Sequence, residues 1–181
     1  MKKILLIHGW NYLNYTSKTK ETDAWHNRQE MVQELKKDYE VYKLNLPGFC
    51  GAEEPKKAWN LDDYADFIKE YLDKHKLKVD YVLGYSFGGA VAISYYLKHG
   101  KNEKVILVSP AIIRNNNASK KFMKTPKILD KVRNKIRDFY LIHIVKTNEM
   151  VSGTKFLRNT YQIIVRVDLR DKVIKIPSDK L

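Results

Sequence analysis

Short apolar runs alternate with amphipathic stretches along residues 1–110 of the chain. Four runs, at residues 3–7, 39–46, 79–83 and 104–109, are rich in Ile, Leu, Val and Tyr, and each stops at or runs into a glycine or a proline. Runs with apolar residues at consecutive positions are typical of strands buried in a parallel sheet. We therefore predict four strands in this part of the chain.

Two amphipathic stretches between these runs predict helices at residues 24–37 and 61–72, and the largely apolar stretch at residues 89–99 predicts a buried helix. Asn60 is a good N-cap for the second helix because Asp63 follows three residues later, and Gly100 is expected to close the third helix from the C′ position. Strand and helix thus alternate. This order predicts an α/β fold with a mostly parallel sheet and helices on both faces.

The pattern changes after residue 113. Residues 114–160 are predicted to form two or three helices separated by Pro126 and Gly153. Residues 154–167 are assigned to helix as well, although the apolar run at residues 163–165 is also compatible with a strand. The stretch from Lys172 to Pro177 is expected to be the approach to a fifth strand.

Composition excludes several classes of protein. The 181 residues are 44% hydrophobic and 12% aromatic, which suits one domain with a buried core and excludes a disordered chain. The single cysteine, Cys50, forms no intrachain disulfide, so a disulfide-stapled secreted scaffold is excluded. The apolar run after the basic start is too short for a signal peptide or a membrane span, and a cytoplasmic location is expected.

The net charge of +13 lies mainly in the second part of the chain. Residues 101–181 hold 19 basic and 7 acidic side chains, whereas residues 1–100 hold 15 and 14. A basic region is one feature of nucleic-acid binders. Only seven of the basic residues are Arg, the side chain preferred for phosphate and base contacts, so a lysine-rich composition bias explains the surplus better.

The candidate chemistry lies at residues 84–88, Gly-Tyr-Ser-Phe-Gly, between a predicted strand and a predicted helix. A serine hydroxyl that attacks a carbonyl group must project from a sharp turn, and Gly84 and Gly88 allow strand and helix to pass close to that turn. Ser86 is therefore the predicted nucleophile. The helix N-terminus behind it offers backbone N–H donors to the oxyanion that forms.

A second turn supports this prediction. His8 and Gly9 follow the first predicted strand, and Gly9 permits a tight turn that points the next N–H group into the space above the sheet. An oxyanion hole needs two donors. We expect them to be the backbone N–H groups of Trp10 and Phe87.

These motifs resemble, in chain order, those of the α/β-hydrolase superfamily, in particular its cap-bearing serine esterases and lipases. The similar segments are residues 8–10 (H-G-x), 46–51 (with Asn45 where Asp is usual), 84–89 (G-x-S-x-G-G), 105–110 (ending L-V-S-P) and 174–177 (I-x-x-P). The resemblance implies a hydrolase core over residues 1–113, a helical cap over 114–167 and the incomplete start of the C-terminal core over 168–181. It implies hydrolysis of a carboxylic ester, or another small acyl substrate, through an acyl-enzyme on Ser86.

The resemblance also implies that the acid and the histidine of a catalytic triad are missing. In this family both follow the nucleophile, on loops after the last two strands, and those strands would begin at or beyond Leu181. His143 is the one histidine in a segment able to fold over Ser86, but a packed core role suits it better than that of a base. Asp168 and Asp171 are expected to be polar ends of the connection between cap and core.

Two alternatives stay open. One is a noncatalytic binding or scaffold protein, because acid and base are missing and residues 111–160 hold 12 basic and 3 acidic side chains. The other is a nucleic-acid binder, for which the sequence has no zinc spacing, phosphate loop or helix-turn-helix signature. No metal and no cofactor are expected. The open sheet edge after the fourth strand predicts self-association.

Overall fold

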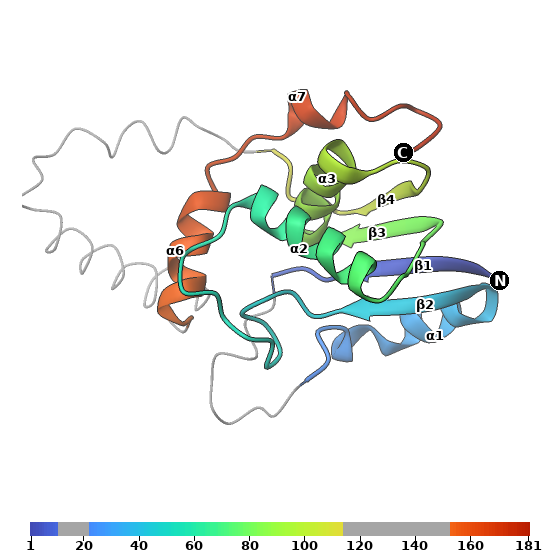
Figure 1. The fold of residues 1–181 in the computed structure, drawn as a ribbon, viewed down its shortest axis with the longest axis horizontal. Helices are drawn as coiled ribbons and strands as arrows, with labels where there is room; N and C mark the ends of the chain where they lie inside the picture. Colours follow the sequence, from blue (N-terminus) through green and yellow to red (C-terminus); the bar gives the residue numbers. More distant parts are fainter. Residues whose placement is uncertain (11–21, 114–152) are drawn as a thin grey trace, which may run out of the picture.

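A four-stranded parallel sheet forms the centre of the molecule (Figure 1). The structure, a computed structural model, describes residues 1–10, 22–113 and 153–181. The strands are β1 (Lys2–Ile7), β2 (Tyr39–Leu44), β3 (Tyr81–Tyr85) and β4 (Lys104–Val108), in the spatial order β2-β1-β3-β4. In this register, Leu5 in the middle of β1 lies opposite Tyr42 on one side and Val82 on the other.

Helices cover both faces of the sheet, which confirms the predicted α/β class (Figure 1). On one face lies α1 (Gln29–Asp38), preceded by the short 3₁₀ turn η2 (His26–Arg28), and its Val32 packs with Ile4 and Leu6. On the other face lie α2 (Leu61–Lys74) and α3 (Phe87–His99), which pack with Leu5 and Ile7. Successive residues of β1 thus alternate between the two layers, as the pleat of a strand requires.

The ends of α2 and α3 show how well local signals predict helix boundaries. Asn60 caps α2: its side chain accepts hydrogen bonds from the N–H groups of Asp62 (2.7 Å) and Asp63 (3.0 Å), and the Asp63 carboxylate accepts one from Asn60 N–H (2.7 Å). Gly100 does end α3, but with φ of −63° rather than in the left-handed conformation typical of C′. Glycine is needed there for space, because a Cβ would lie 2.6 Å from the carbonyl oxygen of Tyr96.

A further helix, α6 (Lys155–Ile164), stands at the carboxyl ends of the strands (Figure 1). Its position confirms the helix predicted over residues 154–167, and Thr154 caps it by accepting a hydrogen bond from Leu157 N–H at 3.2 Å. Phe156, Leu157 and Ile164 are buried against the core. This helix brings the C-terminal part of the described chain next to the carboxyl ends of the strands.

Residues 172–177, predicted as the approach to a fifth strand, are not themselves extended. The chain forms a short helix there, α7 (Arg170–Val173), followed by turns. Asp168 accepts a hydrogen bond from Arg170 N–H, and the carbonyl of Leu169 accepts from Lys172 and Val173, so local bonds satisfy the backbone. The chain reaches the sheet only at Lys180, whose carbonyl accepts a hydrogen bond from Val105 N–H at 2.6 Å.

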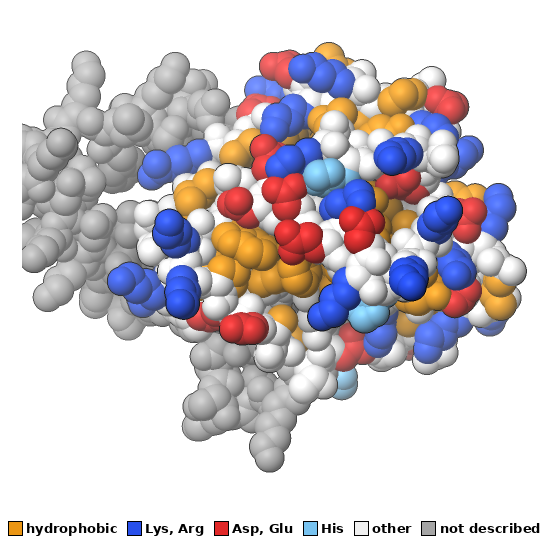
Figure 2. All heavy atoms as spheres, in the orientation of Figure 1, with side chains coloured by type: hydrophobic (Ala, Val, Ile, Leu, Met, Phe, Trp, Pro, Cys, Tyr) orange, Lys and Arg blue, Asp and Glu red, His pale blue; other side chains and the backbone are white. Residues whose placement is uncertain are grey.

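The outer face of α2 is acidic, although the whole chain is basic. Figure 2 shows carboxylates gathered beside an apolar patch in the middle of this view, where Asp63, Asp66 and Glu70 line a shallow hollow with Trp59 and Phe67.

Residues 114–152, which make up most of the predicted cap and include His143, lie outside the described residues. Within the described ranges, none of the helices is long and apolar enough to cross a membrane.

Candidate active site

Ser86 occupies the sharp turn between β3 and α3. Its backbone angles are φ 52° and ψ −114°. Residues other than glycine rarely adopt a positive φ. Three backbone hydrogen bonds hold this strained residue. Ser86 N–H donates to Val108 O (2.9 Å), and Ser86 O accepts from Gly89 N–H (3.0 Å) and from Ala111 N–H (2.9 Å). The Ser86 side chain does not cap its own helix.

The two glycines of the motif are required for space. A Cβ on Gly84 would lie 2.6 Å from the Cα of Gly89, and a Cβ on Gly88 would lie 2.5 Å from the carbonyl oxygen of His8. Both distances are shorter than real Cβ contacts allow, and in both cases the obstacle is backbone. The N-terminus of α3 therefore lies directly against the ends of β3 and β1.

Trp10, Ser86 and Phe87 come together in one small pocket of about 160 Å³. Trp10 and Ser86 are 76 positions apart in the sequence, and the parallel pairing of β1 with β3 brings the two strand ends side by side. The indole of Trp10 packs edge-on against the ring of Phe87, with ring centroids 5.2 Å apart. The carboxyl end of a parallel sheet is where α/β folds place their ligands.

His8 is a structural residue of this turn and is fully engaged. Its Nε2 accepts a hydrogen bond from Leu46 N–H at 2.9 Å, and its Nδ1 donates to Gly9 O at 2.7 Å, which assigns the proton to Nδ1. Burial lowers the pKa of His8 to about 4, so the ring is neutral at physiological pH. The ring thus links the end of β1 to the end of β2.

The other side of the pocket comes from residues that no sequence motif marked. They are Ala111, Tyr161, Ile164 and Val165. Tyr161 packs edge-on against Trp10, with ring centroids 5.3 Å apart. The amphipathic pattern of residues 154–167 was the available signal, but it predicts a buried face and not what that face covers.

None of the described residues that line this pocket is a histidine or a carboxylate. Over residues 1–10, 22–113 and 153–181, no group of three or more His, Cys, Asp and Glu side chains is arranged to hold a metal ion. The two predicted polar ends of the cap connection lie at α7, where Asp168 pairs with Arg170 at 2.7 Å.

The chain belongs to the α/β-hydrolase family. The model of the alpha/beta hydrolase fold matches residues 2–147, which is most of the chain, and the parallel sheet with the Ser86 turn fits it. Among solved structures, an esterase from Exiguobacterium antarcticum superposes with a TM-score of 0.64 at 19% identity. The match covers 98% of this chain and 70% of the esterase.

Two curated relatives are named proline iminopeptidase. The protein from Elizabethkingia meningoseptica is 27% identical over 146 residues, covering 72% of this chain and 44% of the relative. The protein from Flavobacterium johnsoniae is 26% identical over 179 residues, covering 83% of this chain and 56% of the relative. The chain thus spans about half the length of these relatives.

Proposed function

We propose that the chain carries the nucleophile and the oxyanion-binding groups of a serine hydrolase that cleaves a carboxylic ester or another small acyl substrate. The observation that carries the proposal is the strained Ser86 turn, which opens into a pocket beside Trp10 and Phe87. A serine in this conformation at the carboxyl end of a strand projects its hydroxyl away from the backbone. The relatives support hydrolysis as the general reaction.

In the proposed reaction, Ser86 Oγ attacks the substrate carbonyl carbon while a general base takes the hydroxyl proton. The backbone N–H groups of Trp10 and Phe87 hold the oxygen that becomes negatively charged. The carbonyl then re-forms, the alcohol leaves with a proton, and water releases the acid from the acyl-enzyme. The resemblance to the family implies that the base lies on a loop after the last two strands of the fold. His143, for which a packed core role is expected, lies outside the described residues.

The mechanism-based test is covalent labelling with a fluorophosphonate probe. We expect stoichiometric modification of Ser86, found by mass spectrometry of the digested protein and lost in Ser86→Ala. Ser109→Ala is the matched control, because Ser109 is also a serine at positive φ (45°) at a strand end, but lies outside the pocket. Labelling that persists in Ser86→Ala would count against the proposal.

A second candidate is a noncatalytic protein that binds a small ligand in the same pocket. It is favoured by the absence of histidine and carboxylate side chains from the described pocket lining. The same experiment tests this candidate, since stoichiometric labelling of Ser86 that is lost in Ser86→Ala would count against a noncatalytic protein.

A further inference from the structure

Tyr85, the residue before Ser86, lies against the turn that carries Trp10. A Cβ on Gly9 would lie 2.9 Å from Tyr85 Cδ1 and 3.3 Å from Ser86 Cβ, so the ring of Tyr85 fills the space beside Gly9. Tyr85 packs on the α1 side of the sheet, with the cluster that contains Trp25 and Val32. The position of its ring therefore limits where the backbone from Gly9 to Trp10 can lie.

Arg28 contacts the same ring at its face and at its hydroxyl. Its guanidinium carbon lies 4.1 Å from the centroid of the Tyr85 ring, and its Nη2 donates a hydrogen bond to the Tyr85 hydroxyl at 2.6 Å. The planar guanidinium makes both a stacking contact and a directed hydrogen bond, which a lysine ammonium cannot reproduce together. One side chain thus fixes both the face and the tip of the ring.

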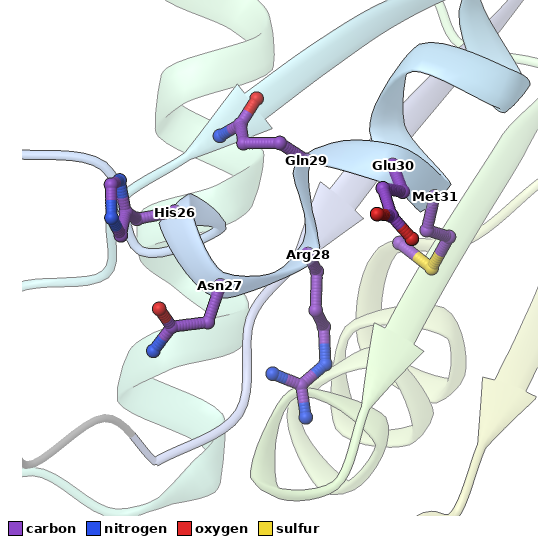
Figure 3. Close-up of a pocket in the computed structure, with 6 residues that line it drawn as sticks. All are labelled: His26, Asn27, Arg28, Gln29, Glu30 and Met31. Carbon is purple, nitrogen blue, oxygen red and sulfur yellow. The ribbon is translucent and has the colours of Figure 1, made fainter.

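The turn that carries Arg28 is itself anchored. Arg28 N–H donates to Trp25 O at 2.8 Å, and the neighbouring Gln29 side chain donates to Asp23 at 2.8 Å. Figure 3 shows that Arg28 and Gln29, adjacent in sequence, point to opposite sides of this turn. Burial alone would raise the pKa of Asp23, but hydrogen bonds from Lys43, Trp25 N–H and Gln29 lower it, so the anchor is a carboxylate at neutral pH.

We infer that Arg28 is a positioning residue for the oxyanion-binding groups of the Ser86 site. It holds the Tyr85 ring against Gly9, and the ring in turn fixes the direction of the Trp10 N–H group. The inference rests on the proposed function, because it assigns that N–H group to the oxyanion. Arg28 belongs to η2, an element outside the pocket, and would thus influence the rate at which Ser86 is acylated without lining the pocket itself.

The test measures two quantities in Arg28→Ala, Arg28→Lys and Tyr85→Phe. The first is the second-order rate of Ser86 modification by the fluorophosphonate, and the second is hydrogen exchange at the amides of Gly9 and Trp10. Lys36→Ala is the matched control, since it also removes an exposed positive charge from the α1 region. Circular dichroism and the thermal midpoint show that each variant is folded.

We expect Arg28→Ala to slow labelling by about threefold to tenfold, because one of two donors is misaligned rather than removed. Exchange at Gly9 and Trp10 should become faster, while the thermal midpoint stays close to that of Lys36→Ala. Arg28→Lys should recover part of the rate, and Tyr85→Phe, which keeps the ring and loses the hydroxyl, should lie between wild type and Arg28→Ala.

Rates and exchange in Arg28→Ala that equal those of Lys36→Ala would overturn the inference. A fall in labelling that follows only a fall in the thermal midpoint would overturn it too, since the role would then be stability alone. If Ser86 is not labelled in any variant, the proposed function fails, and the exchange data at Gly9 and Trp10 still decide whether Arg28 positions the turn.

Discussion

The imidazole of His8 cannot take up a second proton in the folded chain without losing a hydrogen bond. One ring nitrogen accepts a hydrogen bond from Leu46 N–H and the other donates to Gly9 O, inside a buried environment that also contains the ring of Phe49. Protonation would turn the acceptor into a donor facing another donor. His8 therefore stabilises the fold only in its neutral form.

This feature predicts a pH dependence of stability. The pKa of His8 is lowered to about 4, whereas an unfolded histidine titrates near 6.5, so the unfolded chain binds a proton more readily. Neutral His8 makes its full contribution to the free energy of unfolding above about pH 6.5. This contribution is lost as the pH falls toward 4, and the loss amounts to roughly 3 kcal/mol. We expect the thermal midpoint to fall across this window in wild type and less steeply in His8→Gln.

His75→Gln is the matched control, because His75 is exposed at the end of α2. Its pH profile should follow that of wild type. A His8→Gln profile as steep as wild type between pH 6.5 and 4 would show that other groups cause the acid sensitivity.

Single residues also show what sequence patterns leave out. Asn45 stands where the family usually has Asp, and its side chain donates to Thr22 O (2.6 Å) and accepts from Ala24 N–H (3.3 Å). A carboxylate accepts only, so Asn is the residue that satisfies both partners. The sequence motif identifies the position of Asn45, but its hydrogen-bond partners, Thr22 and Ala24, come near only when the chain folds.

At the level of elements, the start of α3 packs directly against strand backbone. Gly88 faces the carbonyl groups at the end of β1, and Ser86 is bonded to the end of β4, so the start of one helix is fixed against two strands. A helix so close to the sheet leaves no space for even a methyl group. The geometry of the Ser86 turn depends on this contact.

Gly88→Ala is expected to destabilise the fold by about 2 kcal/mol or more, because its Cβ would overlap backbone atoms that cannot move aside. Denaturant unfolding measures the change. Gly153→Ala is the control, since a Cβ there would have its nearest neighbour at an ordinary 3.5 Å, and its effect should stay within about 0.5 kcal/mol. Equal effects of the two substitutions would contradict the packing described here.

Most elements could be predicted from local sequence, because apolar runs, the Asn60 cap and the glycine-flanked serine act over a few residues. The helical turn at α7 could not. Its apolar residues resemble those of a strand, but Asp168 and Leu169 satisfy the local backbone and favour a helical turn. The pocket wall on α6 could not be predicted either, since long-range contacts alone place Tyr161 beside Trp10.

At the scale of the whole molecule, β4 forms one edge of the four-stranded sheet. Val105 N–H bonds to Lys180 O, and the alternation of a parallel strand directs the N–H group of Leu107 toward the same edge. Such an edge pairs readily with another strand. This geometry supports the proposal that the chain associates with itself through β4.

The prediction is a concentration-dependent change at one amide. Hydrogen exchange of Leu107 should slow as the protein concentration rises, while exchange of Val105, already bonded to Lys180, should change little. Size-exclusion chromatography with light scattering gives the mass under the same conditions. A monomer at all concentrations, with unchanged exchange at Leu107, would rule out association through this edge.

The pocket beside Ser86 draws its walls from four distant parts of the chain, around residues 10, 86, 111 and 161–165. These parts meet only after the sheet has paired and α6 has docked, and contacts so far apart in sequence are expected to form late in folding. Reaction of Ser86 with an active-site probe is then a kinetic reporter. In a refolding experiment, the appearance of label at Ser86 marks the time at which the long-range contacts of the chain are complete.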